Sequence, residues 1–180
     1  MNKDQVKLIE NILSEFGIDA DYLQNNILAM EEDIGEDSLT TIIENVYAKP
    51  AKCTEETRSA WELMQRDAQK EGVYLKIISS YRSVQYQAEL IKRKLARGQK
   101  IEKILKVNAL PGWSEHHTGR ALDLTSSEED QVLEESFENT KAFHWLTEHA
   151  GKYGFVMSYP RGNSQGYIYE PWHWCYQKNS

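Results

Sequence analysis

Two short stretches of the chain contain side chains of the types that bind metal ions and move protons. In residues 114–123, His116 and Asp123 stand seven positions apart with a glycine between them. Near the C-terminus, Glu170 stands three residues before His173. Imidazole nitrogen and carboxylate oxygen are zinc ligands, and a catalytic zinc site combines three protein ligands with one open position. We therefore interpret His116, Asp123 and His173 as candidate ligands of a catalytic Zn²⁺ ion.

Glu170 is the candidate general base of such a site. Zinc lowers the pKa of its bound water to about 7, and a carboxylate outside the ligand set can take the proton and pass it to the leaving amine. On a regular strand, residues three apart point to opposite faces, but Pro171 lacks an N–H and interrupts strand pairing. We expect Glu170 at a turn or bulge and a strand that begins near Trp172. His173 and Cys175 would then share one face of that strand.

Arg82 is the candidate for stabilising negative charge on the carbonyl oxygen during amide hydrolysis. It stands between a predicted strand and a predicted helix, where a side chain can reach a cleft. Each of these residues has a structural alternative when it is considered alone. A histidine can be an ordinary polar residue, Asp123 can cap a turn, and Arg82 can form a salt bridge. The catalytic interpretation depends on their occurrence together.

The elements that must position these side chains follow from apolar spacing and from turn residues. Helical spacing predicts helices over residues 2–16, about 20–31, about 37–47, 55–70, 84–97 and 139–150. Residues with high strand propensity predict strands over 73–79, 120–124, 155–157, 167–169 and 172–176. This order favours an α+β fold with an antiparallel sheet. The segment before Pro50 lacks strand signals and histidine, so we predict a helical extension over 1–50 and a catalytic domain over 51–180.

Composition excludes some classes of function. The chain has 21 basic and 28 acidic residues, which argues against a general nucleic-acid binder because such proteins need a basic surface. No segment approaches the ~20 apolar residues of a membrane span, and charges interrupt the apolar runs near Met1 as they would not in a signal peptide. We expect a cytoplasmic protein, with signal-independent export or release during phage lysis as alternatives. Cys53 and Cys175 are expected to be reduced thiols, and the oligomeric state is not indicated.

The motifs resemble those of the VanY-type zinc D-alanyl-D-alanine carboxypeptidases. The resemblance lies in Ser-x-His-x-x-Gly-x-Ala-x-Asp over residues 114–123 and in Glu-x-x-His over 170–173. Residues 79–83 with Gln87 are similar to that family's Ser-Gly-Tyr-Arg-Ser…Gln segment, although Ser80 replaces the usual glycine. The resemblance covers about residues 55–176 and does not extend to the first 50. VanX-type dipeptidases, L,D-carboxypeptidases and some phage endolysins share the fold of this family.

The resemblance implies a role for each matching residue. It implies that His116, Asp123 and His173 are the zinc ligands, and its spacing selects His116 over the adjacent His117. Glu170 matches the catalytic base, and Arg82 matches the residue that polarises the scissile carbonyl. Ser114 and Gln87 match positions that line the substrate site.

The function implied by the resemblance is that of a zinc metallopeptidase. The expected structure is an antiparallel sheet that forms a zinc-peptidase cleft flanked by helices. The expected reaction is hydrolysis of the terminal D-Ala-D-Ala bond of peptidoglycan peptides or precursors. The alternatives are an L,D-carboxypeptidase, a D-Ala-D-Ala dipeptidase and an endolysin endopeptidase. A non-catalytic binder of cell-wall peptide is a further alternative, which Glu170 argues against because a binding module needs no base beside a metal ion.

Overall fold

The centre of the fold is a four-stranded antiparallel sheet with the strand order β3-β4-β6-β5. The computed structural model describes residues 1–18, 29–128 and 132–177. The strands span Leu75–Ser79 (β3), Ala121–Ser126 (β4), Phe155–Met157 (β5) and His173–Tyr176 (β6). The mixture of helices with an antiparallel sheet confirms the predicted fold class. In the part of the chain that is described, no helix is both long and apolar enough to cross a membrane.

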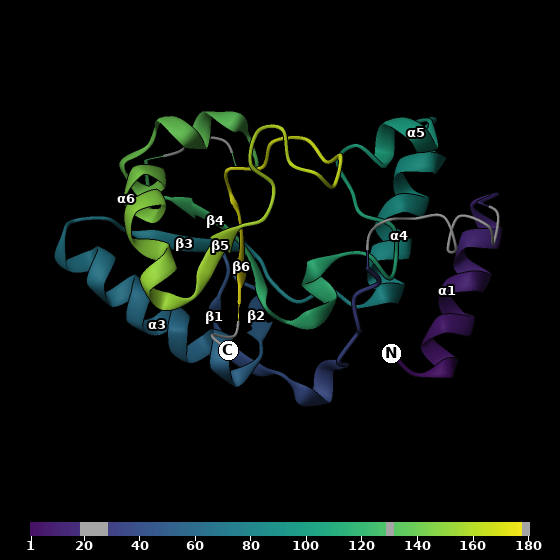
Figure 1. The fold of residues 1–180 in the computed structure, drawn as a ribbon, viewed down its shortest axis with the longest axis horizontal. Helices are drawn as coiled ribbons and strands as arrows, with labels where there is room; N and C mark the ends of the chain where they lie inside the picture. Colours follow the sequence, from purple (N-terminus) through teal and green to yellow (C-terminus); the bar gives the residue numbers. More distant parts are fainter. Residues whose placement is uncertain (19–28, 129–131, 178–180) are drawn as a thin grey trace.

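The larger hydrophobic core lies between this sheet and the helices α3 (Glu55–Lys70) and α6 (Lys141–His149). Figure 1 shows both helices on the same side of the sheet. Because successive side chains on a strand alternate between faces, Leu122 and Leu124 of β4 enter this core beside Trp61 and Leu146. Asp123, which lies between the two leucines, therefore points to the opposite face.

A second core joins the N-terminal helix to the helices that follow β3. The helices are α1 (Lys3–Glu15), α4 (Val84–Ala96) and the short α5 (Ile101–Ile104), and they stand together at the right of Figure 1. The buried residues that they share include Ile9, Leu13, Val84, Ile91 and Ile104. The N-terminal helix is thus packed on α4 and is not separate from the rest of the molecule.

Within the described residues, short 3₁₀ helices occupy four further connections. They are η1 (Glu36–Ser38), η2 (Glu115–Thr118), η3 (Glu135–Asn139) and η4 (Ala150–Tyr153). The predicted helices over 2–16, 55–70, 84–97 and 139–150 are confirmed, as are the predicted strands over 73–79, 120–124, 155–157 and 172–176.

Two predicted elements are wrong. Residues 37–47 form no long helix, because β1 (Thr40–Glu44) follows η1 and pairs antiparallel with β2 (Pro50–Cys53). Residues 167–169 form no strand, and Ile168 N–H instead donates to Lys106 O.

The N-terminal region also bears on two other predictions. The helix predicted over about 20–31 lies mainly on residues 19–28, outside the described residues, and residues 29–35 are irregular. The β1–β2 hairpin spans residue 50, where we placed the domain boundary. The division into 1–50 and 51–180 stays a prediction.

Candidate active site

Strand pairing brings the candidate ligands together. Asp123 of β4 and His173 of β6 are direct cross-strand partners, and Asp123 Oδ1 lies 3.1 Å from His173 Nδ1. His116 comes from η2, and its Nε2 lies 3.2 Å from Asp123 Oδ2. The two histidines are each 3% exposed and Asp123 is 5% exposed. One ligand atom from each residue lies within 4.8 Å of the other two, so the group can hold a metal ion.

The remote nitrogen of each histidine has its own partner. His116 Nδ1 lies 2.7 Å from Ser80 O, and it must donate because a carbonyl oxygen only accepts. His116 Nε2 is then the lone-pair nitrogen that faces Asp123. His173 Nε2 lies 2.8 Å from Glu115 Oε2, which leaves His173 Nδ1 facing Asp123. Histidines that bind metals are held in this way by a carbonyl or carboxylate behind the ring, so both rings fit a metal site.

Glu115 is a site residue that the sequence did not reveal. Its Oε2 also accepts a hydrogen bond of 2.6 Å from Ser158 Oγ. Burial alone raises the pKa of Glu115, but hydrogen bonds from His173 and Ser158 outweigh burial and hold the pKa below its ordinary value. Glu115 therefore stays ionised behind His173. Its contact with a residue 58 positions away depends on tertiary structure, and no motif spacing indicated it.

Glu170 occupies the turn that Pro171 was expected to produce. His173 N–H donates to Glu170 O over 3.1 Å, and Glu170 N–H donates to Tyr159 O. This turn directs the carboxylate back to the site, with Glu170 Oε2 3.9 Å from His173 Nδ1. Burial raises the pKa of Glu170 to about 7. A carboxyl group with such a pKa can accept and release a proton near neutral pH.

Arg82 reaches the cleft from the turn between β3 and α4. Its Nη1 donates to Gln87 Oε1 over 3.1 Å, and its Nη2 lies 3.9 Å from Asp123 Oδ2. Gln87 is buried on α4 and donates in turn to Ala109 O over 2.6 Å. Gln87 therefore fixes the guanidinium from behind. Arg82 Nε is buried and has no hydrogen-bond partner among the described residues.

His117 has both ring nitrogens engaged by the backbone. Gly112 N–H donates to His117 Nε2 over 3.1 Å, so His117 Nδ1 carries the proton that is donated to Arg82 O over 2.6 Å. Burial lowers the pKa of His117 to about 4. With neither nitrogen free, His117 links the η2 turn to the Arg82 turn.

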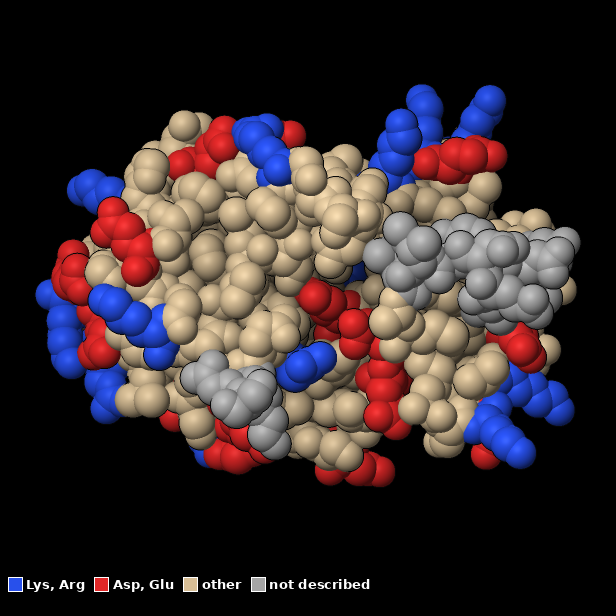
Figure 2. Space-filling view, viewed as in Figure 1, with Lys and Arg blue, Asp and Glu red and all other residues tan. Residues whose placement is uncertain are grey.

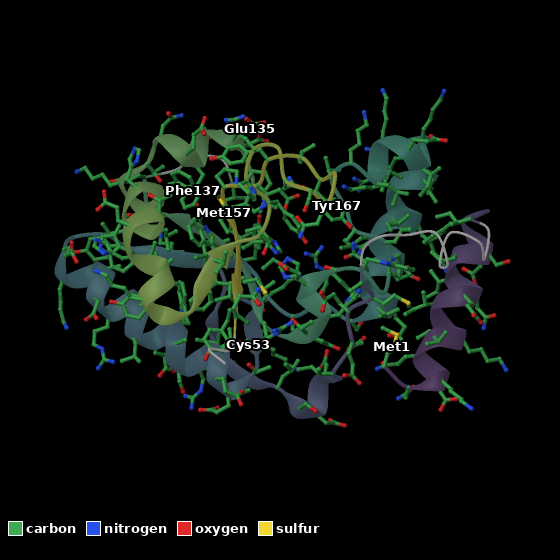
Figure 3. The ribbon with its side chains drawn as sticks, in the orientation of Figure 1. Met1, Cys53, Glu135, Phe137, Met157 and Tyr167 are labelled. Carbon is green, nitrogen blue, oxygen red and sulfur yellow. The ribbon has the colours of Figure 1, made fainter. Side chains whose placement is uncertain are left out.

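All of the predicted site residues line one cleft of about 280 Å³. Figure 2 shows a hollow between the sheet and α4 in which charged side chains gather. In Figure 3, Tyr167 lies on the long connection from β5 to β6. This residue lines the cleft together with Tyr159 and Trp172. Ser114 also lines the cleft and is 4% exposed. The cleft thus combines a group that can hold a metal ion, a carboxyl group with a pKa of about 7 and a cation.

Comparisons with known proteins agree with this arrangement. The YodJ protein of Bacillus subtilis (strain 168) is 36% identical over 124 residues, which cover 67% of this chain and 45% of that protein. The solved LdcB LD-carboxypeptidase is 30% identical, with a TM-score of 0.75 over 84% of this chain and 73% of that chain. A mutant of the VanB-type D,D-pentapeptidase VanY, solved with Zn(II), is 24% identical, with a TM-score of 0.61 over 83% of this chain and 86% of that chain.

The family model matches most of this chain, whereas the match to YodJ covers only part of that relative. The chain spans less than half the length of YodJ. The likeness to the VanY mutant shows a shared fold. The family match runs from residue 50 to residue 179 and includes every residue of the cleft named above. The chain belongs to the VanY family of D-alanyl-D-alanine carboxypeptidases.

Proposed function

We propose that the protein is a zinc metallopeptidase that removes the terminal D-alanine from peptidoglycan peptides or precursors ending in D-Ala-D-Ala. The observation that carries this proposal is the buried group His116, Asp123 and His173 with Glu170 beside it. A metal-binding protein without turnover needs no such carboxylate. Family membership and the D-Ala-D-Ala specificity in the family's description support the substrate class.

The donor set suits zinc. Two imidazole nitrogens and one carboxylate oxygen are a usual set of three for a catalytic zinc ion, and the residues that would hold it are His116, Asp123 and His173. The VanY mutant of the same fold was solved with Zn(II). When bound, zinc lowers the pKa of a coordinated water to about 7 and polarises carbonyl groups.

Glu170 supplies the proton transfers in the proposed reaction. Its carboxylate accepts a proton from the attacking water and gives it to the amine of the departing D-alanine. A nearby cation favours the ionised form of a carboxyl group, so a loaded site keeps Glu170 ready to accept. The carboxylates of Asp123 and Glu115 are occupied by histidine contacts and do not compete for this role.

Arg82 stabilises the charge that develops on the scissile carbonyl oxygen. A fixed donor is most effective when it needs no reorganisation during the reaction, and the Gln87 contact holds the guanidinium in place. Arg82 lines the cleft, where its guanidinium can meet a substrate oxygen. Ser114 is proposed to contact the substrate. Gln87 is proposed to line the substrate site and to support Arg82.

An L,D-carboxypeptidase is the second candidate, favoured by the similarity to LdcB. Mass spectrometry of products from matched muropeptides distinguishes the two. A D,D-carboxypeptidase converts a pentapeptide into a tetrapeptide and stops there, whereas an L,D-carboxypeptidase converts a tetrapeptide into a tripeptide. Release of the D-Ala-D-Ala dipeptide, or no hydrolysis of any peptide with zinc present, contradicts both.

Zinc binding to the metal-free protein should release a proton from His173. Burial opposes a charge on this imidazole, but hydrogen bonds to Asp123 and Glu115 raise its pKa to about 10. A histidine must be neutral to bind a metal, so at about pH 7 His173 contributes roughly one proton per zinc ion bound, and the total released should be at least that number. Calorimetry in buffers with different ionisation enthalpies measures this number. Because the site stays protonated below that pKa, zinc affinity should also rise between about pH 6 and about pH 8. A flat profile contradicts the prediction.

Replacing Glu115 with glutamine should weaken zinc binding about 10- to 100-fold, the usual effect of losing an outer partner of a ligand. The amide can still accept a hydrogen bond from His173, but it lacks the charge that keeps the ring oriented and basic. Competition with a chromophoric chelator gives the affinity. The control is Glu36→Gln, which makes the same change at an exposed position. Equal affinities for Glu115→Gln and the parent exclude this role.

A further inference from the structure

Residues 31–39, here called the brace segment, lie before the part of the chain that matches the family and pack against the site. Ile34 N–H donates to His117 O over 3.3 Å. A Cβ atom placed on Gly119 would lie only 2.7 Å from Leu39 Cδ2, so the Leu39 side chain packs directly on the Gly119 backbone. Gly119 has a φ of 64°, which also favours glycine. The brace segment therefore covers the turn that carries His116.

Asp33 of the brace segment bonds to both sides of Arg82. Its Oδ1 accepts a hydrogen bond of 2.6 Å from Tyr81 Oη, and its Oδ2 accepts one of 2.8 Å from Val84 N–H. Asp33 Oδ1 also accepts from Gly35 N–H over 3.0 Å, which fixes the carboxylate within its own loop. Arg82 thus lies between two residues that are held by one carboxylate.

The bond to Val84 also anchors the start of α4. Val84 is the first residue of that helix, and the first N–H groups of a helix have no partner within it. Ser83 Oγ satisfies Tyr86 N–H as the N-cap. Asp33 satisfies Val84 N–H and places negative charge at the positive end of the helix.

The backbone of Arg82 is held from the opposite side by η2. Arg82 N–H donates to His116 O over 3.2 Å, and Arg82 O accepts from His117 Nδ1. With Asp33 bound to the flanking residues, the turn has contacts on two sides. The position of the guanidinium relative to the metal-binding group therefore depends on Asp33, although the Arg82 side chain has its polar contacts with Gln87 and Asp123.

We propose that Asp33 is a positioning residue for Arg82, so that the brace segment completes the catalytic cleft of the family domain. Its effect on turnover rests on the proposed function. Loss of the Asp33 carboxylate frees the turn, and a small displacement of a catalytic group can lower a rate by up to about 100-fold.

A double-mutant cycle tests this proposal. In the zinc-loaded protein, Asp33→Ala should lower kcat for a peptide ending in D-Ala-D-Ala by about 10- to 100-fold, with zinc content unchanged. The same substitution in an Arg82→Ala background should cause no further loss, because Asp33 acts through Arg82. An equal fractional loss in both backgrounds overturns the proposal. Asp37→Ala, at an exposed position in the same segment, is the matched control.

A second measurement needs no substrate. In an NMR spectrum of the arginine Nε–Hε groups, Arg82→Lys identifies the Arg82 signal. We expect that signal to be sharp and slow to exchange in the parent, and broadened or shifted in Asp33→Ala but not in Asp37→Ala. An unchanged signal overturns the proposal. A parent that hydrolyses no peptide contradicts the proposed function, while this spectrum still decides the role of Asp33.

Lys94, which also lines the cleft, carries a separate inference. It follows Gln87 by seven residues on α4, which places it on the same side of the helix and about 10 Å further along the axis. Lys94 is half-buried and lines the cleft, and within the described ranges its side-chain ammonium group has no hydrogen bond or ion pair. Burial and the charge of Arg82 both lower the pKa of Lys94. A partly desolvated ammonium without a counter-ion is unfavourable, and a carboxylate from a ligand would restore the missing pair.

We infer that Lys94 binds a carboxylate of the substrate peptide, an inference that rests on the proposed function. An extended peptide advances about 3.3–3.6 Å per residue, so the distance from Gln87 to Lys94 corresponds to about three residues. The carboxylate can belong to an acidic residue upstream of the scissile bond or to the C-terminus itself. Both sources offer the same chemistry to the ammonium.

Calorimetry with the zinc-loaded Glu170→Ala variant separates the two sources without turnover. The probes are a peptide ending in D-Ala-D-Ala with one upstream glutamate, its glutamine analogue and its C-terminal amide. Adding Lys94→Met should weaken binding of the first peptide about 3- to 10-fold. If Lys94 binds the upstream glutamate, the glutamine analogue should bind equally well with and without Lys94→Met. If Lys94 binds the C-terminus, the C-terminal amide should behave in this way.

The control for charge is Lys103→Met on α5, where Figure 2 shows lysine and arginine side chains projecting into solvent. Equal binding of all three peptides before and after Lys94→Met overturns the inference. A loss that persists for both analogues also overturns it, because no carboxylate would then be responsible. Failure of every peptide to bind contradicts the proposed function together with the Lys94 inference.

Discussion

Replacing Glu170 with alanine should lower kcat for hydrolysis of a D-Ala-D-Ala peptide by about 10²- to 10⁴-fold, the usual contribution of a general base. No other described carboxylate at the site is free to take over. Asp123 accepts from His173, and Glu115 accepts from His173 and Ser158. Glu170 Oε2 has only a contact of 3.9 Å with His173 Nδ1. Its removal therefore deletes the proposed proton acceptor without removing a proposed ligand.

The measurement combines steady-state kinetics with metal analysis. Zinc content of Glu170→Ala should equal that of the parent, which separates loss of the base from loss of the ion. Glu170→Gln preserves size and should be as inactive as the alanine variant, because an amide accepts no proton at neutral pH. Glu102→Gln, an exposed change on α5, should have parental activity. Parental turnover by Glu170→Ala rules out the proposed mechanism.

The sequence was most informative where a site residue belongs to a short motif. His116 and Asp123 stand seven positions apart, and the turn at Glu170 follows from the missing N–H of Pro171. The pairing of β4 with β6 then makes Asp123 and His173 direct neighbours. The residues that support the site are less visible. Glu115 lies 58 positions from His173 and Asp33 lies 51 positions from Val84, so their roles arise only when the chain folds.

The β1–β2 hairpin shows how a local pattern can mislead. Leu39, Ile42, Ile43 and Val46 have the spacing of an amphipathic helix. Residues 40–43 are all β-branched, however, and such side chains favour strands. Tertiary contacts decide the outcome, because Val46 N–H donates to Ile77 O and Asn45 Nδ2 donates to Ile78 O beside β3. Those partners lie more than 30 residues away, so the spacing of apolar residues within 37–47 does not indicate them.

His116→Ala and His117→Ala should have opposite consequences although the residues are adjacent. His116→Ala removes a proposed ligand and should weaken zinc binding by more than the ~10- to 100-fold expected for an outer partner. His117→Ala should keep parental zinc affinity, because both of its nitrogens already bond to backbone groups. It should instead lower the free energy of unfolding by about 1–3 kcal/mol, since Gly112 N–H and Arg82 O lose their partner.

Zinc titration and urea denaturation of the metal-free proteins measure the two effects separately. Denaturation without metal matters because bound zinc stabilises the folded state and would hide the contribution of His117. Loss of zinc affinity in His117→Ala with retention in His116→Ala means that the ligand register is shifted by one residue. The hydrogen bonds argue against that shift. His116 Nδ1 is fixed by Ser80 O and presents Nε2 to Asp123, whereas His117 has no nitrogen left to present.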